Sequence, residues 1–245
     1  MLKGKLIFAT LVFMLSVACS SSDSDDEEES SDKSTFTLKG AGSGSTDLLA
    51  SSPSVAKLTV YQFAISKNKD CSDPVVVFSE ASGKEVDMEE GPTLGSGDVD
   101  NGAYECVIME MDDEITFTPS ETDGSCTADT EYSINVCRQF QEGTTIKSTL
   151  LDGSEVTCTD DKEKIAVYIS TYSANSSDTP DPFNAPESNN SDSGIKLSSK
   201  LVVSAAITGQ FKMDTTDKVD GSNDECDLQP PVFGFTKVNA NSDSE

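Results

Sequence analysis

The sequence predicts an all-β protein, and three observations lead to this prediction. Helical periodicity is hard to find after residue 18, whereas short alternating or β-branched runs recur between Gly, Asp, Asn, Ser and Pro residues. About ten to twelve such runs follow one another, which is typical of a β-sandwich or a β-barrel. No strong linker and no repeat of fixed period interrupts residues 35–238, and all-β domains of this size form single units.

The strand-like runs of the first half of the chain are TFTLKG (35–40), VAKLTVYQFAIS (55–66), PVVVFS (74–79), KEVDM (84–88), GAYECVIMEM (102–111) and EITFTP (114–119). The run at 55–66 is partly apolar on both faces, with Leu58 and Val60 on one and Phe63 on the other, which indicates a central strand. Asp112-Asp113 separates two of the runs, so we expect a hairpin over 103–118 with a tight acidic turn.

The second half continues with TEYSINVCR (130–138), TIKSTLL (145–151), SEVTC (154–158), EKIAVYISTYS (163–173), SKLVVSAAITGQFKM (199–213) and VFGFTKV (232–238). Asp152-Gly153 predicts a hairpin turn, and Gly209 predicts a bulge. The long loop at 174–194 is the one place where the domain could divide into two subdomains. Residues 239–245 are expected to form a flexible tail.

Residues 1–18 have the layout of an export signal. A basic start with Lys3 and Lys5 precedes the apolar run LIFATLVFML, and small residues, Ser16-Val17-Ala18, follow it. The apolar run is too short for a transmembrane helix, which needs about 20 residues. We therefore predict a signal peptide over 1–18.

The motif S-V-A-C, ending at Cys19, resembles the lipobox of bacterial lipoproteins. It departs from the strict pattern because Ser16 stands where Leu is usual. The resemblance implies that Cys19 receives a diacylglyceryl group and becomes an acylated N-terminus. Ser20 follows the cysteine, which under the sorting rule of some bacterial lipoproteins favours the outer membrane over the inner one. Cleavage by ordinary signal peptidase, giving a protein without a lipid, is the alternative.

The stretch after Cys19 changes composition at once. Residues 20–34, SSSDSDDEEESSDKS, contain no apolar side chain and cannot offset their ordering entropy by burial. Like charges extend such a segment. We therefore expect residues 19–34 to be a lipidated, disordered acidic tether between the membrane and a β domain at 35–238. A calcium-binding acidic tail is the alternative interpretation.

Cysteine counting supports export independently. Without Cys19, an even set of six remains: Cys71, Cys106, Cys126, Cys137, Cys158 and Cys226. Exported chains enter an oxidising space, so the set predicts three disulfides, with six buried thiols as the alternative. Pairing of sequential neighbours is expected, namely Cys71–Cys106, Cys126–Cys137 and Cys158–Cys226. The chain has no histidine and no C-x-x-C motif, which argues against zinc.

The net charge of −27 narrows the range of partners. Nucleic-acid binding is excluded because it needs a basic patch, and the single arginine, Arg138, offers no phosphate clamp. An acidic surface favours a cationic protein or a divalent ion as partner. Dense negative charge is also a common means to solubility, which requires no partner.

Catalysis finds little support in the sequence. Without histidine there is no Ser-His-Asp or Cys-His arrangement. The spacing S-x-x-K occurs at Ser30/Lys33, Ser54/Lys57, Ser66/Lys69 and Ser193/Lys196, but in tether, loop or strand-edge positions. Segments 98–102 and 217–225 have incomplete calcium-loop spacing and are better explained as turns. We predict no enzyme, no catalytic residue, no metal site and no cofactor.

The stretch from VYQFAIS through GAYECVIMEM to ITFTP resembles prealbumin-like or immunoglobulin-like modules of bacterial envelope proteins, in which G-x-Y opens a strand, as Gly102 and Tyr104 do here. The resemblance implies a β-sandwich and carries no functional residue. The expected function is that of a membrane-anchored envelope or surface lipoprotein used for interaction or envelope structure. The alternative is an exported binding module for divalent cations or a basic ligand.

Overall fold

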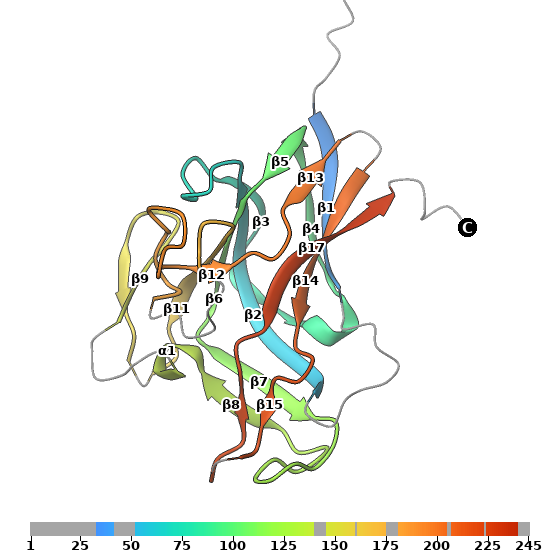
Figure 1. The fold of residues 1–245 in the computed structure, drawn as a ribbon, viewed down its shortest axis with the longest axis vertical. Helices are drawn as coiled ribbons and strands as arrows, with labels where there is room; N and C mark the ends of the chain where they lie inside the picture. Colours follow the sequence, from blue (N-terminus) through green and yellow to red (C-terminus); the bar gives the residue numbers. More distant parts are fainter. Residues whose placement is uncertain are drawn as a thin grey trace, which may run out of the picture. The chain divides into compact units, whose positions relative to one another are not determined.

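The structure is a computed structural model that describes residues 33–41, 52–139, 146–159, 161–174, 181–204, 207–222 and 224–239. The chain forms two compact units, Met1–Ser31 and Asp32–Glu245, and every described residue belongs to the second. The predicted signal peptide, Cys19 and the tether up to residue 32 lie outside the described residues. The regular structure of the described part is mostly β-strand, which confirms the all-β prediction (Figure 1).

The strands are β1 (Lys33–Ala41), β2 (Pro53–Ser66), β3 (Val75–Asp87), β4 (Thr93–Asp100), β5 (Gly102–Tyr104), β6 (Cys106–Asp112), β7 (Glu114–Pro119), β8 (Tyr132–Asn135), β9 (Lys147–Thr149), β10 (Glu155–Thr157), β11 (Lys164–Ser170), β12 (Ile195–Lys196), β13 (Leu201–Val203), β14 (Ile207–Asp214), β15 (Val219–Asp220), β16 (Asp227–Leu228) and β17 (Val232–Asn239). The short helices are the 3-10 helix η1 (Met88–Glu90) and α1 (Val136–Gln139).

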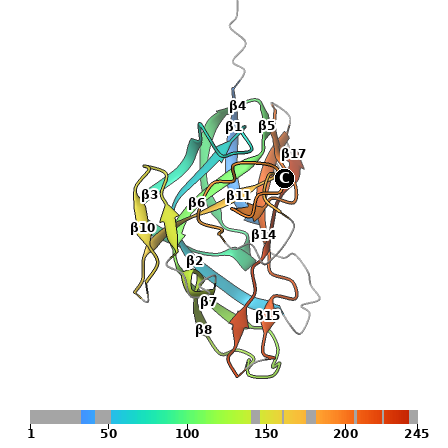
Figure 2. The ribbon, with the colours of Figure 1, turned by 60° about the vertical axis from the view of Figure 1, so that its left-hand side comes forward.

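Two main sheets face each other in a β-sandwich-like arrangement. One has the order β17-β14-β1-β4, and the other has the order β12-β11-β6-β2-β7-β8 with β3 on the second edge of β2 (Figures 1 and 2). Aromatic side chains join them: the ring of Phe63 on β2 meets that of Phe211 on β14 edge-on at 5.1 Å between centroids. Phe233 stacks on Phe211 at 5.8 Å. The main apolar core therefore lies between the sheets.

β2 is central, as predicted, but its two faces do not alternate throughout. Val60 pairs with Met111 and Gln62 with Glu110, so β2 carries one extra residue, Tyr61, at a bulge. Because a bulge reverses the alternation, Phe63 lies in the same core as Leu58 and Val60 instead of on the opposite face. The bulge also places Tyr61 on the outer face of the sheet, where its hydroxyl bonds Asp112 of β6.

The hairpin predicted over 103–118 is wrong. β6 and β7 both pair antiparallel with β2, through its C-terminal and N-terminal halves respectively, so they follow one another along one edge of that strand. Asp112-Asp113 is the buried junction between them and not an exposed turn. Every residue of β6 is buried, and partners on both edges, β2 and β11, satisfy its backbone better than one short hairpin partner would.

Two further strands differ from the prediction. β3 joins the runs at 74–79 and 84–88 into one strand, whose pairing with β2 shifts across residues 80–83. β4 was not predicted because TLGSGDVD has the composition of a loop. Gly95 allows close approach to β3, since a Cβ there would lie 3.1 Å from Cδ2 of Phe78.

The strands in the second half of the chain agree with the prediction in part. β9 and β10 form the hairpin predicted at Asp152-Gly153. The run at 199–213 forms two strands, β13 and β14, and Gly209 lies opposite Lys237 in unbroken register instead of at a bulge. In the long loop, residues 175–180 lie outside the described ones, but Phe183 is fully buried in the main core. β1 begins at Lys33, two residues before the expected strand.

All six cysteines of the described residues form disulfides: Cys71–Cys106, Cys126–Cys226 and Cys137–Cys158. The first pair was predicted, and the other two correct the predicted Cys126–Cys137 and Cys158–Cys226. The reason is a long-range contact between two loops, in which Ser125 N–H donates to the carbonyl of Gly221 at 3.0 Å. The approach is so close that a Cβ at Gly221 would overlap the carbonyl oxygen of Asp123.

The disulfides should differ in their contribution to stability. Cys126–Cys226 closes a sequence separation of 100 residues, and Cys137–Cys158 one of 21. Chain entropy gives about 4.7 kcal/mol for a 100-residue loop and about 3 kcal/mol for one of about 15. We expect Cys126→Ala/Cys226→Ala to lower the free energy of unfolding in urea by more than the matched Cys137→Ala/Cys158→Ala pair. A non-reducing digest that yields Cys126 linked to Cys137 would contradict the pairing.

Candidate functional site

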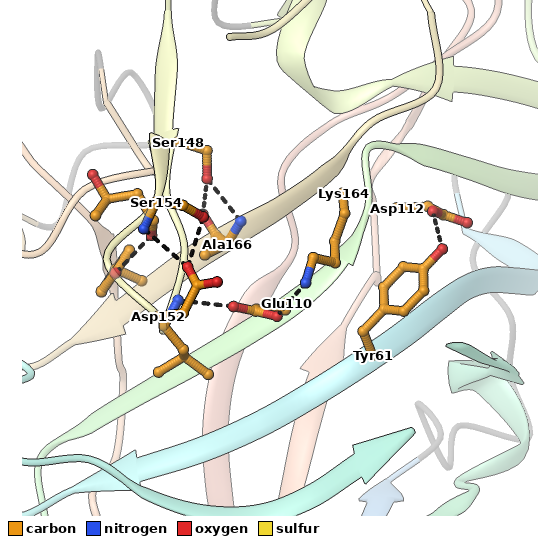
Figure 3. Close-up of polar contacts among 11 residues, drawn as sticks. Tyr61, Glu110, Asp112, Ser148, Asp152, Ser154, Lys164 and Ala166 are labelled. Carbon is orange, nitrogen blue, oxygen red and sulfur yellow. Dashed lines mark hydrogen bonds and ion pairs between the residues drawn. The ribbon is translucent and has the colours of Figure 1, made fainter. Parts of the chain in front are cut away.

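The outer face of β6 carries the most concentrated group of buried charges in the described residues. Val107, Met109 and Met111 face the main core, whereas the alternate residues face a second, smaller apolar cluster that includes Leu150 and Tyr168. Glu110 and Asp112 lie on this outer face at exposures of 2% and 4%. Buried carboxylates require partners, because an uncompensated charge away from water is costly. Figure 3 shows those partners.

Glu110 joins three elements of the sheet and its cover. Its Oε2 accepts an ion-pair contact from Lys164 Nζ on β11 at 3.0 Å, and its Oε1 accepts the backbone N–H of Leu151 at 2.8 Å (Figure 3). Leu151 belongs to the turn between β9 and β10, so the carboxylate holds that hairpin against β6. Ser148 hydroxyl reinforces the contact by donating to the carbonyl of Ala166 at 3.1 Å.

Asp112 joins β6 to β2 and to the start of β11. Tyr61 hydroxyl donates to Oδ1 at 2.8 Å (Figure 3). Lys162 Nζ contacts Oδ2 at 2.9 Å. Burial and the bond to Asp112 raise the pKa of the Tyr61 phenol above its usual range. The same carboxylate raises the pKa of Lys162, chiefly through the hydrogen bond. Lys164 Nζ lies 5.8 Å from the Tyr61 ring centroid, within reach of a cation–π interaction.

Asp113 is fully buried and joins the sheet to α1. Its Oδ1 accepts Glu163 N–H at 3.0 Å, its Oδ2 accepts the Asn135 amide at 2.9 Å, and its carbonyl accepts Val136 N–H at 2.7 Å. Burial raises the pKa of this carboxyl above its usual range, although the bonds from Glu163 and Asn135 act in the opposite direction.

Together these contacts form a structural brace. Both oxygens of Glu110, Asp112 and Asp113 accept a hydrogen bond or an ion pair. A general base or a metal ligand needs an oxygen that can turn to a substrate or an ion, and these oxygens are committed within the fold. Among the described residues, no group of three or more His, Cys, Asp or Glu side chains could hold a metal ion.

The S-x-x-K spacings form no serine–lysine pairs where both residues are described and their bonds are known. Ser66 hydroxyl donates to Ser72 carbonyl at 2.5 Å, while Lys69 lies over the Tyr172 ring. Ser54 hydroxyl donates to Thr118 carbonyl at 3.2 Å on β7. Lys196 Nζ donates to Thr171 carbonyl at 2.9 Å.

Residues 98–100 end β4 and Gly102 begins β5, so the turn predicted at 98–102 is reduced to a bend at Asn101. The described part of 217–225 combines a turn at Asp217 with the short strand β15. At 98–102, Asn101 accepts the Ser34 hydroxyl and Gly102 has a positive φ of 146°. At 217–225, Asp220 Oδ1 accepts Ser222 N–H at 2.9 Å. Hydrogen bonding from the Ser222 side chain, and then from this N–H, lowers the pKa of Asp220. Asp220 thus bonds the local backbone, as turn-forming side chains do.

Open polar grooves remain on the surface. One of about 630 Å³ is lined by Asp181, Glu187 and Asp192 together with amide and hydroxyl side chains of residues 184–193. Another, of about 690 Å³, is lined by Asp224, Glu225 and Asp227 beside Arg138. The acidic lining of both suits a cationic ligand better than an anionic one.

Comparison with protein-family models, with curated proteins and with solved structures finds no match to this chain. Within the described ranges, no helix is both long and apolar enough to cross a membrane.

The brace makes a stability prediction. Lys164→Met leaves the Glu110 carboxylate, 2% exposed, without its cation, and we expect the free energy of unfolding to fall by about 1–3 kcal/mol. Lys147→Met is the matched control, because both partners of the Lys147–Glu155 pair are more than half exposed. It should cost about 0–1 kcal/mol. Glu110→Gln added to Lys164→Met should recover part of the loss, and equal small losses in both lysine variants would contradict the brace.

Asp113 makes a pH prediction. Its raised pKa means that the native state binds this proton more tightly than the unfolded chain does, so the charged carboxylate lowers stability at neutral pH. As the pH falls from about 7 to about 4, through the raised pKa toward the ordinary carboxyl value, that penalty is removed. We expect wild type to gain stability relative to Asp113→Asn over this range in urea titrations. Parallel pH profiles of the two proteins would show that Asp113 is not coupled to folding in this way.

Proposed function

We propose that this protein is an exported envelope or surface lipoprotein, anchored through lipid on Cys19, with no catalytic role. The observation that carries the proposal is the use of the cysteines. All six in the described domain are paired with one another. The seventh, Cys19, therefore has no partner to form a disulfide within the domain, and it stands directly after an export-signal pattern.

The position of the first strand supports the tether. β1 begins at Lys33, so residues 20–32 separate the proposed lipid from the sandwich. A segment of this length can reach about 45 Å when fully extended. Its like charges favour extension, and anionic head groups would repel it. One acyl chain binds a bilayer only marginally, whereas the two or three chains of a lipoprotein hold firmly.

The described domain supports an interaction or structural role. Its buried charges are committed to the brace, and its cysteines are committed to disulfides, so neither group offers a nucleophile or a general base. Three disulfides suit a protein in an oxidising space outside the cytoplasm, where disulfides persist. For a partner we propose a cationic protein or a divalent ion, because the acidic grooves and the net charge of −27 favour positive charge.

We also propose that the sandwich is of the prealbumin-like or immunoglobulin-like type and that it is displayed at the outer membrane. The two facing sheets with an aromatic core support the first proposal. The parallel pairing of β1 with β14 departs from the antiparallel sheets of immunoglobulin constant-type domains. Ser20, which follows Cys19, supports the proposal of display at the outer membrane.

The anchor is tested by metabolic labelling with a clickable fatty acid, followed by intact mass. Wild type and the matched control Ser21→Ala should incorporate label and partition into detergent, whereas Cys19→Ala should do neither. The intact mass of the mature wild-type protein should match a chain that begins at an acylated Cys19. It should be lower by six hydrogens than that of the reduced chain, two for each of the three disulfides. Equal labelling of Cys19→Ala, or a mature protein with a bare Cys19, would reject the anchor and favour an exported soluble binding module.

A further inference from the structure

A small apolar cavity lies between the two sheets. Its volume is about 50 Å³, and its lining combines core side chains of β2, β6 and β14 with the segment around Pro230 and Pro231. Gln139 and Gln229 are the polar residues of the lining, and both are partly exposed, as are the two prolines. The cavity is therefore reached from the surface on the side where these residues lie.

Methionines are concentrated at this cavity. The chain has six, of which Met1 and Met14 belong to the predicted signal peptide. Three of the remaining four, Met109, Met111 and Met213, line the cavity. Met109 and Met111 are alternate residues on the core face of β6, and Met213 comes from β14 of the facing sheet. All three are buried, with exposures of 2%, 2% and 3%.

The chemistry of this lining selects one class of ion. Thioether sulfur is a soft ligand that favours Cu(I) and related soft ions over hard cations. Hard divalent ions need several oxygen ligands, and the lining supplies almost only carbon and sulfur. The usual soft competitors are missing from the described domain, because its cysteines are in disulfides and the chain has no histidine.

Size and charge agree with a single monovalent ion. The share of liquid volume taken by one water molecule is about 30 Å³, so the cavity holds one small bare ion and little else. A charge in an apolar cavity costs solvation energy, and a monovalent ion keeps that cost lower than a divalent one. The net charge of −27 adds a negative potential that favours any cation over any anion.

We propose that Met109, Met111 and Met213 form a binding site for one soft monovalent cation, Cu(I) or its stable analogue Ag(I). The three methionines belong neither to the lipid anchor nor to the acidic grooves, although the cavity shares Ile134 and Gln139 with the groove beside Arg138. Methionine is also a common filler of irregular core gaps, which is the competing explanation for the same three residues. The two explanations differ in whether the sulfur atoms are needed.

The test uses silver nitrate in chloride-free buffer with the full-length exported protein, its disulfides intact. Native mass spectrometry should find one Ag(I) per chain. With methyl-labelled methionine, the resonances of Met109, Met111 and Met213 should shift on titration, while that of Met88, a buried residue that does not line the cavity, should shift least. This titration uses the wild-type protein, and variants are needed only to assign the methionine resonances.

Variants then separate the sulfur from the packing. Met→Leu conserves volume and is well tolerated in cores. Each single variant at the three positions should weaken Ag(I) affinity at least tenfold, and the triple variant should abolish it with a near-unchanged melting curve. Met88→Leu is the matched control and should keep full affinity. The absence of 1:1 binding, equal shifts at Met88, or binding that survives the triple variant would overturn the site and leave the methionines as core filler. If the triple variant fails to fold, the wild-type titration and the single variants decide between the two explanations.

Discussion

The fold depends on the complete burial of β6. All seven of its residues, including Glu110 and Asp112, are withdrawn from water, and the strand is paired on both edges. A strand in this position needs apolar cover on two faces and backbone partners on two sides. The facing sheet covers one face, and the β9–β10 hairpin covers the other. The order of the seven-stranded sheet follows from these demands.

The charges on β6 are a consequence of this position. An apolar residue at 110 would bury its surface without needing a partner, whereas Glu110 requires both Lys164 and the backbone of Leu151. Such a carboxylate adds little net stability, but its bonds are satisfied in one arrangement of β6, β11 and the hairpin. The brace therefore specifies how the outer layer sits on the sheet, while the apolar core between the sheets supplies most of the driving force.

The sequence was informative where one local pattern decides the outcome. β2 and β11 were recognised because their apolar runs are long, and the β9–β10 hairpin because Asp-Gly has one favoured turn geometry. β4 was not predicted because Gly95 is explained by its close contact with Phe78 of β3, and the composition of β4 does not reveal that contact. The brace was missed for a related reason. Asp112-Asp113 has the composition of a turn, and only the fold brings the Tyr61 hydroxyl and Lys162 to the Asp112 carboxylate.

The disulfide pairing also could not be predicted from local sequence patterns. The number of bridges follows from counting, but their pairing depends on which loops meet in space. Cys126 and Cys226 lie in two loops that are joined backbone to backbone. Among the described residues, the apolar cluster around them has four buried members, one of which is Cys126 itself. A covalent link is most useful where little apolar area is buried, because it restricts the unfolded chain without needing a core. The 100-residue bridge thus lies at the smallest of the three apolar clusters of the described residues, and the Cys71–Cys106 bridge joins the start of β6 to the loop between β2 and β3.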